Sequence, residues 1–258
     1  MKRNLLDMVQ EILSDMDSDE VNSIDDTIES EQVATILKST FFAMMANRDW
    51  PHTRQTIQIS AIGDSTKPTH MKLQDGIKSI CFINYNKVQL GDTRKKYEKI
   101  KYLEPDQFIF KTNLENSDSE EVSIVTDFGG IELLVRNDRA PTYYTSFDDE
   151  HIVFDSYDSQ VDSTLREAKV QAQAYVTPSW SSVDNFIPDL PEMAFPALVE
   201  EAKSRAALKL KQVVDQKAEQ EAARQNRWLS RNARRVHAGI KYPSYGRGKV
   251  NLPGAPKC

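Results

Sequence analysis

Four side chains that could bind a metal ion or transfer protons gather near the middle of the chain: Asp148, Asp149, His151 and Asp155. If the segment from His151 onward is a strand, His151 and Asp155 share one face with Val153, because side chains alternate along a strand. A metal-dependent hydrolase could use such carboxylate and imidazole groups as ligands. An Asp-rich turn leading into a strand with a polar outer face explains the same residues. We favour the turn.

A second metal-like pattern lies near the N-terminus, where carboxylates alternate as in a calcium-binding loop: Asp15, Asp17 and Asp19. Such a loop needs Gly at its sixth position for a sharp turn, and this chain has Glu20 there. The eighth position is Asn22 rather than an apolar residue, and the twelfth is Asp26 rather than Glu. These mismatches favour a solvated acidic loop between two helices.

The other histidines and both cysteines are isolated in the sequence. His52, His70 and His237 have no ligand partners at a recognisable spacing, and no Ser, Thr or Cys lies in a nucleophile motif. Cys81 and Cys258 match neither a disulfide framework nor a zinc site. We therefore expect no enzymatic activity, no cofactor and no bound metal.

The strongest charge pattern lies at the C-terminal end. From Arg224 to Cys258 all nine charged residues are Lys or Arg, which leaves 24 basic and 39 acidic residues in positions 1–223. That larger part carries a formal charge of about −15, although the whole chain carries only −6. Segments of like charge repel internally and are typical of interaction tails. We therefore expect this basic arm to bind an anionic partner.

The arm combines cationic and aromatic side chains, and we expect these nine to contact the partner: Trp228, Arg231, Arg234, Arg235, Lys241, Tyr242, Tyr245, Arg247 and Lys249. They could bind nucleic acid through phosphate charge and base stacking, or an acidic protein surface on which Arg and aromatic residues serve as anchors. A disordered solubilising tail is the third reading. The negative charge of the rest of the chain would repel DNA, so we favour the protein partner.

The elements that must position these groups are helical at both ends of the chain and extended in the middle. Apolar periodicity predicts helices over 5–13, from Asp25 or Thr27 to about Trp50, over 164–176, and over 195–236, the last about 40 residues and roughly 60 Å long. A short helix is expected over 104–114. Alternating apolar residues predict strands at 56–60, 71–73, 80–85, 121–126, 130–136, 143–145 and 151–154.

These elements predict an α+β fold, namely an α-helical bundle built from both ends of the chain with an inserted β-rich domain and an extended C-terminal arm. The expected divisions are 1–52 for the N-terminal helices, 53–160 for the β-rich domain, 161–235 for a return helix and the long C-terminal helix, and 236–258 for the arm. No apolar run approaches the roughly 20 residues of a membrane helix, and the first residues do not resemble a signal peptide. We expect no membrane partner.

Three stretches carry a family likeness: Arg48 to Trp50 at the end of the second helix, residues 143–155 (YYTSFDDEHIVFD) and residues 186–207 (FIPDLPEMAFPALVEEAKSRAA). With the order of the predicted elements, they resemble the head-to-tail adaptors of short-tailed bacteriophages, of the tail tubular protein A type. The resemblance covers nearly the whole chain and depends on order more than on any one motif.

The resemblance implies a virion protein of the neck, assembled in the host cytoplasm into a ring of twelve copies beneath the portal protein. It also implies a platform for the tail nozzle protein and a channel through which genomic DNA passes without specific binding. Residues 224–235 would end the docking helix, and 236–258 would lie extended on the portal. An acidic body suits such a channel, because negative walls repel phosphate. The alternative is a nucleic-acid-binding protein that uses the same arm.

Overall fold

The computed structural model describes residues 2–88, 94–212 and 215–236, and for 231–236 it describes the backbone only. The chain forms two units, which are treated separately below. Unit 1 comprises Met1–Thr53 and Thr177–Cys258, and unit 2 comprises Arg54–Val176. None of the helices described combines the length and the apolar character that a membrane crossing requires.

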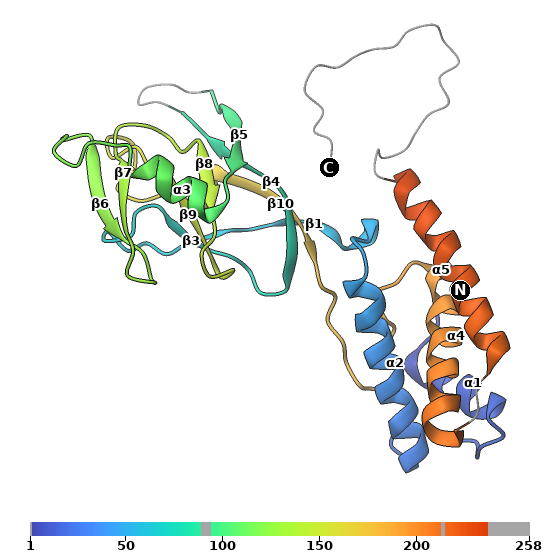
Figure 1. The fold of residues 1–258 in the computed structure, drawn as a ribbon. Coiled ribbons are helices and arrows are strands. Elements are labelled where there is room, and N and C mark those ends of the chain that lie inside the picture. The colour runs from blue at the N-terminus through green and yellow to red at the C-terminus, as the bar shows by residue number, and fades with distance from the viewer. Residues whose placement is uncertain (1, 89–93, 213–214, 237–258) are drawn as a thin grey trace, which may run out of the picture. The chain divides into compact units, whose positions relative to one another are not determined.

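Unit 1 is helical (Figure 1), and its elements are α1 (Leu5–Asp15), α2 (Ile28–Ala46), η1 (Pro51–Thr53), η3 (Glu192–Ala194), α4 (Phe195–Ala206), the π-helical η4 (Ala207–Lys211) and α5 (Gln216–Val236). The Asn4 side chain caps α1 by accepting the backbone N–H of Asp7 at 2.7 Å. Thr27 and Ser30 form a reciprocal capping box at the start of α2. Both N-terminal helices predicted from the sequence are confirmed.

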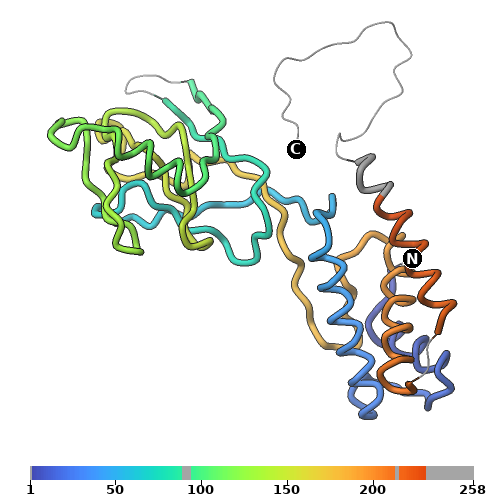
Figure 2. Tube along the Cα trace, in the orientation of Figure 1, coloured from blue at the N-terminus to red at the C-terminus, as the bar shows by residue number. Residues whose placement is uncertain are grey.

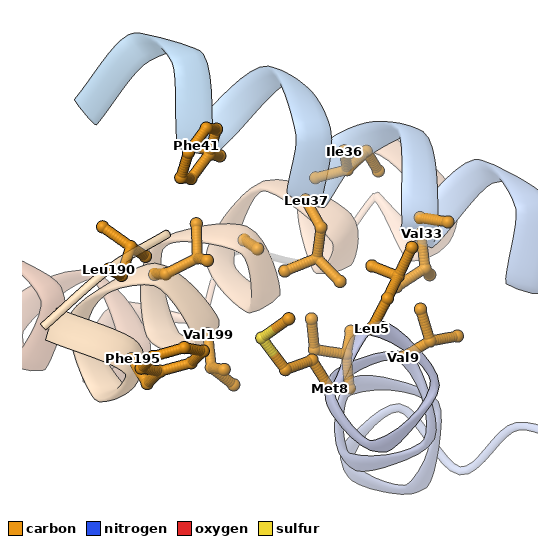
Figure 3. Close-up of a cluster of buried hydrophobic side chains, with 14 of the residues drawn as sticks. Leu5, Met8, Val9, Val33, Ile36, Leu37, Phe41, Leu190, Phe195 and Val199 are labelled. Atoms are coloured by element: carbon orange, nitrogen blue, oxygen red, sulfur yellow. The ribbon is translucent and has the colours of Figure 1, made fainter. Parts of the chain in front are cut away.

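Side chains from both ends of the chain form one apolar core in unit 1 (Figure 3). Met8 of α1, Leu37 and Phe41 of α2, and Phe195 of α4 are at most 1% exposed. The ring of Trp180, which precedes α4 in the chain, lies 5.1 Å from the ring of Phe41. Burying a side chain of this size contributes about 1.5–3 kcal/mol. Unit 1 therefore depends on helices from opposite ends of the sequence.

The C-terminal part of unit 1 is not the single helix of about 40 residues that the periodicity predicts. After α4 and η4, Gln212 has a left-handed backbone with φ 53°. Asp215 then caps a new helix, since its side chain accepts the N–H of Ala218 at 3.0 Å. Helix α5 packs along α4 in both views of the chain (Figures 1 and 2). The predicted long helix is thus two helices folded against each other.

Small residues explain why the two helices can pack so closely. Ala202 and Ala206 of α4 and Ala218 and Ala222 of α5 are at most 2% exposed. The two alanines of each helix are four positions apart, so each pair lies on one face of its helix.

Unit 2 is built on an eight-stranded mixed sheet of order β1-β10-β4-β5-β8-β9-β3-β2. Its strands are β1 (Arg54–Ile57), β2 (Ser60–Ala61), β3 (His70–Lys72), β4 (Ile77–Asn86), β5 (Tyr97–Tyr102), β8 (Tyr143–Thr145), β9 (His151–Phe154) and β10 (Val170–Val176). Neighbouring strands are antiparallel except β5 and β8. A separate hairpin, the helix α3 and the short 3-10 helix η2 complete the unit: β6 (Val122–Thr126), β7 (Glu132–Arg136), α3 (Pro105–Thr112) and η2 (Glu167–Lys169).

The predicted fold class, an α-helical bundle with an inserted β-rich domain, is wrong, because one large mixed sheet organises the middle of the chain. The predicted return helix over 164–176 is wrong as well, since β10 occupies this place between β1 and β4. Ala172 and Ala174 favour helix in isolation, but on β10 they are at most 1% exposed and supply the small side chains that the sheet interior requires.

Strand β9 is buried on both faces. Ile152 and Phe154 belong to the apolar cluster on one side of the sheet, whereas Val153 joins Phe108 of α3 and Leu133 of β7 on the other side. The alternation predicted for this strand is confirmed. The short helix predicted over 104–114 is also confirmed, as α3, and together with the β6–β7 hairpin it covers one face of the sheet.

His70 connects the β6–β7 hairpin to the sheet. Its Nε2 lies 2.9 Å from Oδ1 of Asp127, and its side chain is fully buried. The ring of Phe128 lies 5.6 Å from the ring of His70 and 4.3 Å from that of His151, and the Lys67 ammonium lies 4.6 Å from the Phe128 ring centre. Burial lowers the pKa of His70, although the Asp127 carboxylate acts in the opposite direction. Burial therefore favours the neutral imidazole over the charged form.

Replacing Gln212 by Gly tests the reversal between α4 and α5. Glycine adopts a positive φ without a side-chain clash, so Gln212→Gly should raise the free energy of unfolding of unit 1 by about 0.5–1 kcal/mol. In a continuous helix the same change would lower it by about 1 kcal/mol. All three tryptophans lie in unit 1, so urea denaturation followed by tryptophan fluorescence measures this unit. The control Gln220→Gly, inside α5, should be destabilising.

The buried neutral His70 predicts that unit 2 loses stability in mild acid. Because the pKa is lower in the folded state, the unfolded state binds more protons below about pH 6.5, and the free energy of unfolding falls there. Above that pH the contribution is fully present. His70→Gln keeps a polar group near Asp127 but does not titrate, so it should flatten this pH dependence in urea titrations followed by far-UV circular dichroism.

The matched control is His52→Gln, because burial also lowers the pKa of His52 but this residue lies in unit 1. It should leave the pH dependence of the strand signal unchanged. An equal slope in wild type and His70→Gln between about pH 7.5 and 5.5 would contradict the role given to His70.

Candidate docking surface on the C-terminal helix

Helix α5 presents two different faces. Ala218, Ala222 and Leu229 are at most 5% exposed, and their spacing of four and seven positions places them on one side of the helix. Arg227 and Trp228 lie on the exposed side. The predicted docking residue Trp228 is therefore held at the surface by a helix whose other side belongs to the core of unit 1.

An apolar patch surrounds Trp228. Met193 of η3 is 61% exposed and Trp228 is 44% exposed, which leaves two large apolar side chains in contact with solvent. With Arg224 and Gln225 they line a shallow pocket of about 500 Å³. We call these four residues the Trp228 patch. An aromatic ring and a methionine beside a guanidinium group are the composition that protein interfaces favour at their centres.

One carboxylate orders the polar side of the patch. Oε1 of Glu221 accepts hydrogen bonds from Gln225 Nε2 at 2.9 Å and from Arg224 Nη2 at 2.6 Å. Both hydrogen bonds lower the pKa of Glu221, and the bond from Gln225 has the larger effect. No acidic residue follows Glu221 in the sequence, so the positive charge of Arg227 is not balanced by any later carboxylate.

The corner at Arg48 and Trp50 holds α5 from the other side. The Arg48 guanidinium donates a hydrogen bond to Oγ of Ser230 and lies 4.9 Å from the ring centre of Trp50. Trp50 Nε1 in turn donates to the carbonyl of Met44 at 2.9 Å. Burial lowers the pKa of Arg48. A short stretch that carries part of the family resemblance thus contacts α5 at Ser230.

The structure describes only part of the predicted docking set. Helix α5 extends to Val236 and so includes the backbone of Arg231, Arg234 and Arg235. Five further residues lie outside the described part of the chain: Lys241, Tyr242, Tyr245, Arg247 and Lys249. Sequence reasoning missed Met193, which follows a Pro-rich loop far upstream. Only the reversal at Gln212 brings it beside Trp228, and no local signal predicts that meeting.

The four candidate ligands between 148 and 155 do not form one site. Nδ1 of His151 lies 2.6 Å from Oδ2 of Asp148. Asp155 instead accepts two backbone N–H groups of the segment that begins β8, at 2.8 and 2.9 Å. Asp149 is exposed in a turn, with φ 60°. The predicted Asp-rich turn is confirmed, but the polar outer face predicted for the strand is wrong, because Val153 and Asp155 are at most 5% exposed. Asp155 serves to join β9 to β8.

The acidic residues near the N-terminus also have separate partners. Oδ2 of Asp15 lies 2.7 Å from Nζ of Lys203. Oδ2 of Asp26 accepts the N–H groups of Asn22 and Ser23 at 2.7 and 2.8 Å. Within the described ranges, no group of three or more His, Cys, Asp or Glu side chains is placed to hold a metal ion.

The contact of His70 with Asp127 and Phe128 was also missed, because His70 is isolated in the sequence. The register that pairs Lys72 with His151 is what brings β3 and β9 together. Such a register between strands far apart in the sequence cannot be predicted from local periodicity.

The comparisons with known proteins assign the chain to no family. No protein-family model matches the sequence, and no curated protein matches it either.

Proposed function

We propose that this chain is a structural head-to-tail adaptor subunit of a short-tailed bacteriophage, which docks on the portal protein through its C-terminal arm. The observation that carries the proposal is the exposed Trp228 patch at the start of an entirely basic sequence. From Arg224 onward nine Lys and Arg residues follow without a carboxylate, on a chain whose other part has a charge of about −15. The stretches 48–50, 143–155 and 186–207 support the same assignment by their likeness to the adaptor family, although the predicted order of elements is wrong at 164–176.

The Trp228 patch and the basic arm contribute to docking in different ways. The basic arm steers the subunit toward an acidic surface, because long-range charge attraction raises the rate of encounter. Trp228 and Met193 then lose water against the partner, and buried aromatic anchors supply most of the affinity of an interface. The bond between Arg48 and Ser230 keeps α5 fixed while the arm adapts.

In this proposal twelve copies form a ring in the neck of the virion after assembly in the host cytoplasm. The ring provides a platform for the tail nozzle protein and encloses a channel for the genomic DNA. The net negative charge of positions 1–223 favours passage, because phosphate is repelled and the duplex does not adhere.

Trp228→Ala tests the docking surface. Because interface anchors contribute about 2 kcal/mol or more, the affinity for purified portal rings of the same phage should fall at least about 30-fold, as measured by sedimentation. Deletion of 237–258 should reduce attachment in negative-stain images, because it removes the charge that steers the encounter, and leave the tryptophan fluorescence of unit 1 unchanged. The control Gln220→Ala, at an exposed position of α5, should bind as wild type does. Undiminished binding by the truncated chain would refute the proposal.

Nucleic-acid binding by the same arm is the second candidate. The exposed positions of Arg224, Arg227 and Trp228 on α5 favour it, because guanidinium groups bind phosphate and an indole ring stacks on bases. It predicts duplex DNA binding that weakens steeply between about 50 and 200 mM salt in a filter assay. A flat response over this range would eliminate it.

A further inference from the structure

Strands β4 and β5 separate in the middle of the sheet. They pair from Ile83 to Asn86 of β4, but the last residues of β5 pair with β8 instead. Three residues of β4, Ser79, Ile80 and Phe82, pair with β10 and have no strand on their other side in the part of the chain that is described. The separation leaves a groove of about 740 Å³ within unit 2.

The groove has an apolar floor beside this strand edge. Ile100, Tyr144 and Ile152 are buried members of the main cluster of unit 2, and Ile80 is partly buried against it. Tyr102, at the end of β5, is 48% exposed. An extended peptide that adds to a strand edge directs every second side chain to one face, so its apolar residues could pack against the partly buried Ile80 and the exposed Tyr102.

The rim of the groove is basic. Lys78, Lys99 and Lys101 line it, and Asp149 is the one acidic residue among the lining residues described. Lys99 and Lys101 are exposed and two positions apart on β5, so both point to the same side of the strand. Charge complementarity therefore requires an acidic ligand.

We propose that this groove binds an extended acidic segment of a partner protein. The segment adds as a strand beside Ser79–Phe82, places alternate apolar side chains against Ile80 and Tyr102, and pairs its carboxylates with Lys99 and Lys101. A single-stranded nucleic acid would match the charge, but it would leave the strand edge unpaired. The groove belongs to unit 2 and the docking helix to unit 1, so this binding is independent of the adaptor proposal.

The test uses the full chain and a labelled hexapeptide that alternates Val and Glu, followed by fluorescence polarisation. Saturable binding is expected, at least about tenfold tighter than that of the matched peptide that alternates Val and Lys. Methylation of alternate backbone nitrogens, on the side that faces β4, should weaken binding by a similar factor because it removes the ladder hydrogen bonds. An N-methylated peptide that binds as well as the parent would overturn the strand-addition geometry.

Two double variants separate the groove from general charge effects. Lys99→Glu with Lys101→Glu should weaken binding of the Val and Glu peptide at least about tenfold. Lys38→Glu with Lys209→Glu makes the same charge change at exposed positions of unit 1 and should leave the affinity unchanged. The proposal fails if both variants lose affinity equally or if the Val and Glu peptide does not bind at about 1 mM. Tighter binding of a thymidine oligonucleotide of equal charge would also overturn it.

Discussion

The shared apolar core of unit 1 is the constraint on which the rest of the structure depends. Helices α1 and α2 from the start of the chain and α4 from its end bury one common set of side chains, among them Leu37 and Phe195. Both ends of the intervening chain must therefore connect to unit 1. The first and last strands of that chain, β1 and β10, pair with each other, with Arg54 opposite Tyr175. The same core fixes α5 and, with it, the position from which the basic arm begins.

Local signals predicted those parts of the fold that local chemistry determines. The cap at Thr27, the proline that begins α3 and the alternation along β9 all have their causes within a few residues. The failures have distant causes. The alanines of β10 favour helix until two neighbouring strands surround them, and Gln212 reverses the chain at a residue that carries no Gly or Pro signal.

The candidate docking surface shows the same division. Trp228 was predicted because it lies in a basic sequence, which is a property of the sequence itself. Met193 could not be predicted, because only the packing of α5 on α4 places it in the same pocket as Trp228. The basic rim of the groove in unit 2 was missed for a related reason. Lys99 and Lys101 alternate with a buried Ile100, and so short and charged a segment is typical of a loop. Only its pairing with β4 makes it a strand.

Unit 1 is formed by two separate segments of the sequence, so its two parts are synthesised at different times. Every strand of unit 2 has been synthesised by Val176, before any residue of α4 exists. Helices α1 and α2 are made first, yet Phe41 cannot pack against Trp180, nor the shared core be completed by Phe195, until those residues have emerged. On the ribosome the earliest part of the chain is therefore among the last to reach its final packing, and its apolar faces stay uncovered while the sheet assembles.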